Sequence, residues 1–233
     1  MPESYAKRVR SVLTASEAKR FRALTSPAKI QDFIDTLPVN MELDASTYMS
    51  PRRVLATGRA HCFEGALLAA AVLAFHGERP LLLDFQAAYD DEDHVVALFC
   101  QNGHWGAISK TNHPGLRYRD AIHDSPRSLA ASYFHEYYMW DGRKSLRFFS
   151  RPFALTRYAP ATWITASEEL EWLVDALDAS AHAPIIPKGN LRKLRPASPF
   201  ELHASAAVEW RKDGRRTPIS PRKSGSHAAG GGS

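Results

Sequence analysis

Cysteine is scarce in this chain, which has only Cys62 and Cys100 among its 233 residues. The two thiols could pair, but the beginning of the chain lacks the apolar core and the cleavage site of a secretory signal. No segment has the run of about 20 apolar residues that a membrane-spanning helix needs. We therefore expect a cytoplasmic protein whose thiols stay reduced. In such a chain, a cysteine that lies near a histidine is a candidate nucleophile.

Internal repeats are also lacking, and the positive charge is not spread along the whole chain. The formal net charge is +5, with 44% hydrophobic and 24% charged residues, which is typical of a soluble protein with a real core. Much of the excess Lys and Arg lies between Lys7 and Arg22 and in residues 188–223. Basic ends on a neutral middle are typical of solvated tails. We therefore favour solvated ends over a nucleic-acid groove. A tail that binds nucleic acid is a third hypothesis, and salt-dependent heparin retention that is lost on deletion of residues 184–233 would support it.

One apolar segment, from Gly58 to Phe75, organises the rest of the sequence. It reads GRAHCFEGALLAAAVLAF, and within it Glu64 is the only charged residue after Cys62. A helix that is apolar on every face is buried, and Gly77 is a typical helix stop. Cys62 then lies in the first turn, where unpaired N–H groups and the helix dipole favour thiolate over thiol. The segment therefore predicts a buried helix that begins with a nucleophile.

The remaining pattern predicts helices first and antiparallel strands afterwards. Helices are expected over residues 4–24, from Ser26-Pro27 to before Pro38, after Ser50-Pro51, after Ser125-Pro126 and from Ser167. Strands are expected over residues 81–85, 94–101, 104–110 and within 145–158, with a polar loop at 111–125. Asn102-Gly103 is a strong hairpin signal. This order indicates an α+β fold in which N-terminal helices, including the Cys-bearing helix, pack on an antiparallel sheet.

The domain organisation follows from where this pattern ends. We expect one domain over residues 1–182 and a disordered basic tail, rich in Pro, Ser and Gly, over residues 183–233. Cys100 falls in the middle of a strand and is expected to belong to the core.

His94 is the candidate base for Cys62. It opens the strand HVVALF directly after an acidic turn at residues 90–93, and from there its ring can reach a neighbouring helix end. The Asn102-Gly103 turn pairs Gln101 with His104, so His94 lies near residues 110–112 of the returning strand. The polar residues there that could orient His94 are Ser109, Lys110 and Asn112.

The order of these residues resembles the transglutaminase-like superfamily, which shares the papain-like cysteine-peptidase core. The matching residues are Cys62 in GRAHCFEGA, His94 in DEDHVVALF and Trp105 in NGHWGAIS, over roughly residues 26–140. The family commonly has an Asp four residues after that Trp, where this chain has Ser109. Asn112 is the first candidate for the orienting role, since amides fill it in papain-like triads, with Ser109 and Asp120 as the others.

The resemblance implies acyl transfer through a thioester on Cys62, with water or an amine as acceptor and with no cofactor. The substrate would be a protein or a peptide amide, and no membrane partner is expected. Trp105, His61 and Arg59 are assigned to the substrate side of the site. The oxyanion would be bound by the backbone N–H of Cys62 and one further donor, near Arg59 or His61.

Two other functions remain open from the sequence. A non-catalytic member of the same fold, acting as a binding or scaffold module, is favoured by the missing Asp. A zinc site built from Cys62, His94, Cys100 and His104 is disfavoured, because His94 and Cys100 are separated by about 20 Å of strand.

Overall fold

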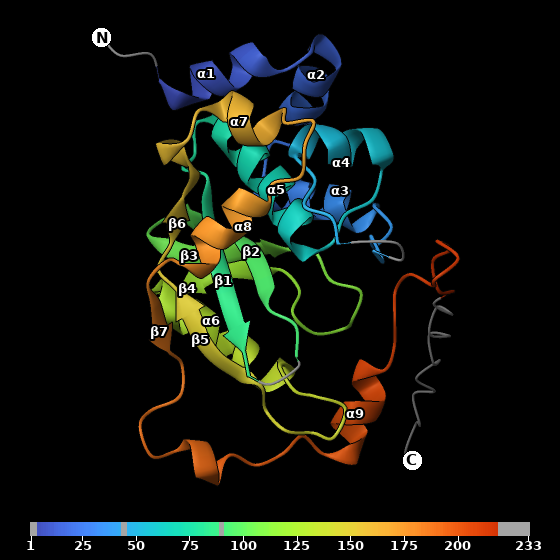
Figure 1. The fold of residues 1–233 in the computed structure, drawn as a ribbon, viewed down its shortest axis with the longest axis vertical. Coiled ribbons are helices and arrows are strands. Elements are labelled where there is room, and N and C mark those ends of the chain that lie inside the picture. The colour runs from blue at the N-terminus through green and yellow to red at the C-terminus, as the bar shows by residue number, and fades with distance from the viewer. Residues whose placement is uncertain (1–3, 43–45, 89–90, 219–233) are drawn as a thin grey trace, which may run out of the picture.

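The computed structural model describes residues 4–42, 46–88 and 91–218. It has the expected α+β class, with helices packed against an antiparallel sheet and Cys62 on one of those helices. Figure 1 shows the N-terminal helices at one end of the molecule and the sheet below them. The buried helix α5 lies between the two.

Helix α5 (Cys62–His76) is surrounded by the helices that precede it in the chain. These are α1 Tyr5–Val12, α2 Ala15–Ala23, α3 Pro27–Asp35 and α4 Pro51–Thr57. Every residue of α5 from Phe63 to Phe75 is buried, as the apolar sequence predicts. The helix ends at Gly77, whose left-handed φ of 99° suits glycine.

Within the described residues, the sheet has seven strands, in the order β4-β3-β2-β1-β5-β7, with β6 paired to β1. The strands are β1 Leu81–Ala87, β2 His94–Gln101, β3 His104–Ser109, β4 Arg119–His123, β5 Leu146–Ser150, β6 Phe153–Ala154 and β7 His182–Pro184. The β2–β3 hairpin turns at Asn102-Gly103 in the predicted register, with Gln101 opposite His104 and Ala97 opposite Ile108. Both turn residues have positive φ, 50° and 82°.

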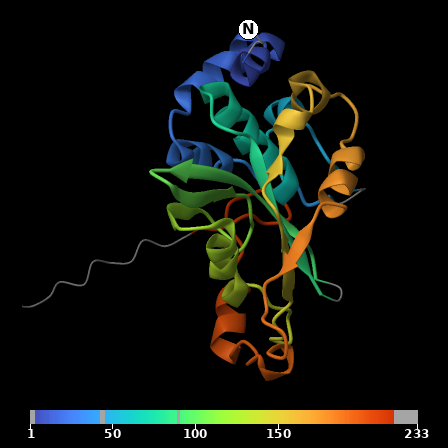
Figure 2. The same cartoon turned by 90° about the vertical axis from the view of Figure 1, so that its left-hand side faces the viewer.

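Two apolar cores fill the two faces of the sheet, because side chains alternate along each strand. On one face, Leu82 and Ala97 pack with α5. On the other face, Leu83 and Leu98 pack with α6 (Pro126–Tyr133). Figure 2 shows α6 on the side of the sheet opposite α5. This sandwich holds the first turn of α5 close to the end of the sheet where β2 begins.

Three expectations differ from the structure. The segment at residues 4–24 forms two helices, because Thr14 and Glu17 make a capping box that starts α2. The expected loop at residues 111–125 contains β4. Cys100 is exposed rather than in the core, because it lies near the end of β2, beyond the point where β1 pairs with it.

The chain after residue 182 also differs from the expected disordered tail. Strand β7 crosses that boundary and pairs with β5, and a 3-10 turn (Leu191–Lys193) and helix α9 (Pro199–Ser205) follow. Residues 209–217 form a hairpin, here called the C-terminal hairpin, in which Trp210 pairs with Arg216. Only the last part of the expected tail, residues 219–233, lies outside the described residues, as does Asp90 of the acidic turn.

The short helices α7 (Pro160–Ile164) and α8 (Glu171–Asp178) complete the layer around α5. No helix among the described residues is long and apolar enough to cross a membrane.

Candidate active site

Cys62 is the first residue of α5, and the residue is partly buried. The first hydrogen bond of the helix runs from the Gly65 N–H to the His61 carbonyl, at 2.9 Å. The N–H groups of Cys62 and Phe63 therefore precede the helix ladder and are left unused by it. Unused N–H groups beside a thiol are the donors that an oxyanion needs.

His61 lies directly beside the thiol. Its Nδ1 is 4.0 Å from the Cys62 Sγ, and its Nε2 is 2.7 Å from the Thr47 carbonyl oxygen. Because a carbonyl only accepts, Nε2 carries a hydrogen. The carboxylates of Glu64 and Glu42 lie 3.5 Å and 3.9 Å from that same nitrogen. The structure therefore surrounds His61 with groups that stabilise an imidazolium ion.

The pKa of His61 is raised to about 9. Burial lowers this pKa, but the hydrogen bond and the charge of Cys62 raise it, with further contributions from Glu64 and the Thr47 carbonyl. At neutral pH His61 is accordingly a cation next to the thiol.

The pKa of the Cys62 thiol is lowered well below its ordinary value. Burial by itself raises it, but side-chain hydrogen bonding to His61 and to His94, together with the charges of both rings, outweighs burial. The two imidazoles thus favour the thiolate form of Cys62, which is the activated form of a cysteine nucleophile.

Glu64 organises the surroundings of His61. Its carboxylate is fully buried and accepts from the His61 N–H at 2.9 Å and the Met49 N–H at 3.1 Å. It also accepts from the Thr47 hydroxyl at 2.8 Å and more weakly from the Asn40 amide. These bonds hold the segment after α3 against α5. They also hold the Thr47 carbonyl within hydrogen-bonding distance of the His61 Nε2.

His94 is oriented by Ser109. The His94 Nε2 is 2.8 Å from the Ser109 Oγ, and the Ser109 hydroxyl donates its single hydrogen to the Leu116 carbonyl. Ser109 must then accept from His94, so a neutral His94 carries its hydrogen on Nε2. Its Nδ1 is left as the basic nitrogen, as a base acting on Cys62 requires.

Both ends of this chain of hydrogen bonds are fixed by neighbours. Gln31, a buried residue of α3, accepts from the Ser109 N–H at 2.9 Å and donates to the Ser109 carbonyl at 2.8 Å. Leu116 adopts a positive φ of 58°, and its N–H donates to Glu136 at 2.7 Å. A branched residue in that conformation is costly, so the contacts around it must hold it in place.

The structure brings together Cys62, His61, His94 and Ser109, but it places Asn112 elsewhere. The Asn112 amide bonds both backbone groups of Trp210, accepting at 2.7 Å and donating at 3.0 Å. Ser109, and not Asn112, is therefore the residue on His94, which reverses the expected order of these two candidates.

Three other expected residues also lie away from the thiol or are engaged differently. Trp105 is the second residue of β3 and lies opposite Cys100, at the end of the hairpin far from Ser109. Lys110 is fully buried and donates to the Leu37 carbonyl at 2.5 Å, which caps the chain after α3. Asp120 is exposed on β4.

A second polar cluster lies near the site on the α5 face of the sheet. The buried Asp84 carboxylate is 2.9 Å from the His182 Nε2. Burial first, and then the charges of Asp93 and Asp178, raise the Asp84 pKa to about 6, against the lowering effect of His182. Burial raises the Asp93 pKa too, and the charge of Cys62 adds to the rise. This cluster places carboxyl groups on the side of Cys62 that faces the sheet.

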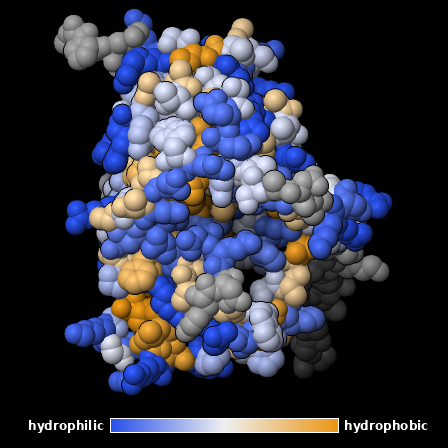
Figure 3. Space-filling model, in the orientation of Figure 1, coloured by the Kyte–Doolittle hydropathy of each residue, from blue (hydrophilic) through white to orange (hydrophobic). Residues whose placement is uncertain are grey.

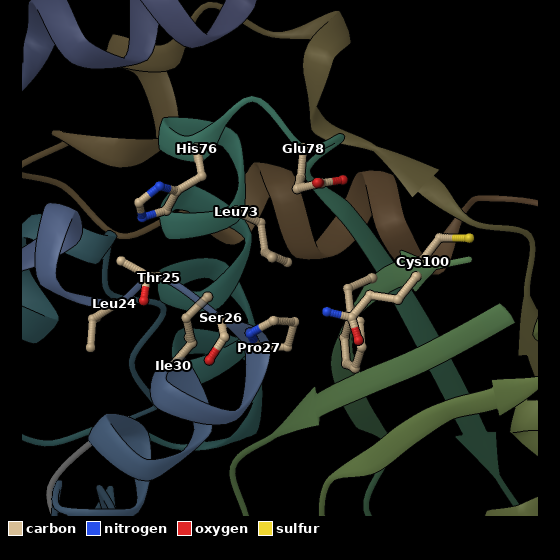
Figure 4. A pocket seen from close by; sticks show the side chains of 11 residues that line it. Leu24, Thr25, Ser26, Pro27, Ile30, Leu73, His76, Glu78 and Cys100 are labelled. Atoms are coloured by element: carbon tan, nitrogen blue, oxygen red, sulfur yellow. The ribbon is translucent and has the colours of Figure 1, made fainter. Parts of the chain in front are cut away.

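Cys100 lies at the opposite end of α5 from this site. It lines a cavity of about 130 Å³ together with Leu73 and His76, near the last turn of that helix. Figure 4 shows Cys100 at the edge of the cavity, with its sulfur directed away from Leu24 and Ile30. The two thiols of the chain therefore have different surroundings, and Cys100 is an internal control for the reactivity of Cys62.

The sequence predicted Cys62, His94 and Ser109 as site residues, and it named His61 only as a substrate-side residue. It missed Gln31 and Glu64, although a glutamine between Ile30 and Ile34 and a carboxylate inside an apolar helix are visible signals. Among the described residues, no group of three or more His, Cys, Asp or Glu side chains could hold a metal ion. Comparison with known proteins gives no further assignment, because no family model and no curated protein matches this chain.

Proposed function

We propose that the protein is a cysteine-dependent enzyme that transfers an acyl group, or hydrolyses an amide, through a thioester on Cys62. The observation that carries the proposal is the thiol at the start of α5, placed between His61 and His94 with its pKa well below the ordinary range. A buried structural cysteine needs neither imidazole. The finer proposal is a transglutaminase-like fold, which the order Cys62, His94, hairpin and Ser109 supports.

In the first half of the reaction, the thiol proton moves to Nδ1 of His94 and the sulfur attacks the acyl carbon. The resulting oxyanion accepts hydrogen bonds from the N–H groups of Cys62 and Phe63. The C–N bond then breaks, and the proton on His94 passes to the leaving amine. The acyl group stays on Cys62 as a thioester.

In the second half, water or an amine attacks the thioester and gives its proton to His94. The C–S bond breaks, the sulfur leaves as the thiolate that His61 stabilises, and the proton on His94 returns to the sulfur. The products are an acid or a new amide, and the enzyme returns to its starting state. These steps require a reduced thiol, as in the cytoplasm, and no cofactor.

The experiment is a panel of activated acyl probes, followed by intact mass measurement of the wild type, Cys62→Ala and Cys100→Ala. The proposal expects one acyl adduct that hydroxylamine removes, present in the wild type and in Cys100→Ala and absent from Cys62→Ala. Equal adducts on both cysteines, or none, would contradict the enzymatic proposal.

A binding module of the same fold is the second candidate function. It is favoured by Ser109, because a hydroxyl carries no charge to stabilise a protonated His94 as the usual Asp does. A thiol that alkylates fast but never turns an acyl adduct over would favour this second candidate.

A further inference from the structure

The C-terminal hairpin is attached to the domain by a set of specific contacts. The Glu209 N–H donates to the Asn112 carbonyl at 2.8 Å, next to the paired bonds between Asn112 and Trp210. The Glu209 carboxylate is 2.7 Å from Arg117 and also pairs with Arg216. These bonds fix the hairpin in one place on the domain, so residues at its tip form a defined part of the surface.

The tip of the hairpin forms one wall of a cavity of about 410 Å³. Arg211 and Lys212 line it on that side, and Glu42, Thr47 and Arg59 line it on the other. Figure 1 shows the hairpin beside the segment that follows α3. The cavity is large enough for an amino-acid side chain, and it is built from two segments that are distant in sequence.

This cavity adjoins the candidate active site through two shared residues. Thr47 accepts from His61 through its carbonyl, at 2.7 Å, and Glu42 lies 3.9 Å from the same ring nitrogen. Since the other ring nitrogen of His61 is 4.0 Å from the Cys62 Sγ, this ring joins the lining of the cavity to the thiol.

The charges that line the cavity favour an anion. Its carboxylates already have partners: Glu42 accepts from the Thr47 N–H at 2.6 Å, and Asp213 pairs with Arg215 at 2.7 Å. Among the described residues, no ion pair within 4.0 Å engages the side chains of the three basic residues, Arg59, Arg211 and Lys212. Figure 3 shows a mainly hydrophilic surface at this edge of the molecule. Arginine is well suited to hold a carboxylate.

We propose that this cavity binds an acidic side chain of a peptide substrate, which Arg59, Arg211 and Lys212 hold while the adjoining residue reaches Cys62. The inference rests on the proposed function for its catalytic meaning, but the binding itself needs no reactive thiol.

The test measures equilibrium binding to full-length Cys62→Ala by fluorescence anisotropy. The probes are two dye-labelled peptides, Glu-Glu-Gln-Gly and its neutral match Gln-Gln-Gln-Gly, both with blocked ends. The acidic peptide is expected to bind roughly fivefold more tightly at low salt, and the preference should shrink as salt is added.

The same measurement is repeated in two double variants with equal loss of charge. Arg211→Gln with Lys212→Gln should reduce the preference to about twofold or less. Arg192→Gln with Lys193→Gln, which are exposed residues outside the cavity, should leave it intact. If the hairpin variant fails to fold, Arg59→Gln on the opposite wall of the cavity tests the same proposal, and it should also reduce the preference for the acidic peptide.

Equal binding of the two peptides, or a preference that survives loss of Arg211 and Lys212, would overturn this inference. Neither result bears on the thiol, whose reactivity is measured in the wild type. Conversely, if Cys62 is unreactive but the preference for the acidic peptide is intact, the proposed enzymatic function is wrong and the proposed binding site stands.

Discussion

His94 and Ser109 are joined by a hydrogen bond of 2.8 Å, and the direction of that bond determines which nitrogen of His94 is basic. Ser109 donates to Leu116, so it must accept from Nε2, and Nδ1 remains for the thiol proton. A serine can therefore select the tautomer that an Asp selects in the usual triad, although it supplies no charge. The site consequently depends on a second imidazole, His61, to stabilise the thiolate.

Loss of the base should be far more damaging than loss of the residue that orients it. His94→Gln is expected to lower acyl turnover by about 10³-fold, since general acid–base catalysis contributes about 10²–10⁴-fold. Ser109→Ala is expected to lower it by about tenfold, because the neutral ring can then adopt either tautomer. Single-turnover decay of the Cys62 acyl adduct, followed by mass spectrometry, measures both. Similar losses in the two variants would contradict the assigned roles.

Asn112 should affect the attachment of the C-terminal hairpin, whereas Ser109 should affect turnover of the acyl adduct. Asn112→Ala removes both bonds to the Trp210 backbone, so limited proteolysis should cut near the C-terminal hairpin faster. Decay of the acyl adduct should stay within about twofold of the wild type, because Asn112 has no contact with His94. A slow decay in Asn112→Ala with an uncut hairpin would restore Asn112 to the catalytic site.

His61 should set the low-pH limit of the reactive thiol. In His61→Gln the thiol loses its cationic neighbour, so its pKa rises and less thiolate is present below neutral pH. Alkylation by iodoacetamide at pH 6 should fall by about tenfold or more, while at pH 9 the two proteins should react alike. The wild type loses this cation only as the pH rises through about 9, where His61 deprotonates. A uniform loss at every pH would point to misfolding.

Glu64 should matter for stability. It is fully buried and accepts from four neighbours, so Glu64→Gln replaces an acceptor oxygen with a donor and leaves buried N–H groups unpaired. The expected loss is about 2 kcal/mol or more in the free energy of unfolding, by urea titration. Glu78→Gln, at an exposed glutamate, is the control and should change it by about 0.5 kcal/mol or less. Equal effects of the two changes would rule out the assigned role of Glu64.

The elements that sequence could predict are those with strong local signals. The segment after Cys62, apolar except for Glu64, predicted α5, and Asn102-Gly103 predicted the register that places His94 near Ser109. Those two features account for most of the candidate site. They depend on short-range rules of periodicity and turn geometry, which do not require knowledge of the rest of the fold.

The remaining features depend on long-range contacts. Gln31 binds Ser109 across 78 positions of the chain, and no local pattern indicates such a pair. The C-terminal hairpin is rich in basic residues and resembles a solvated tail, yet Glu209 and Asn112 attach it to the domain. A break between α1 and α2 was missed because helical spacing continued through Thr14, whose cap the structure reveals.

The most direct measurement is the rate at which iodoacetamide alkylates Cys62 between pH 5.5 and 9, in a Cys100→Ser background that removes the other thiol. A thiol in an unfolded chain has a pKa of about 8.5, so its rate should rise roughly tenfold per pH unit below that value. The folded protein should instead reach a level rate at a pH well below 8.5, and below that pH it should react far faster than the same protein in denaturant. A folded-state profile that rises in parallel with the denatured one would contradict the account.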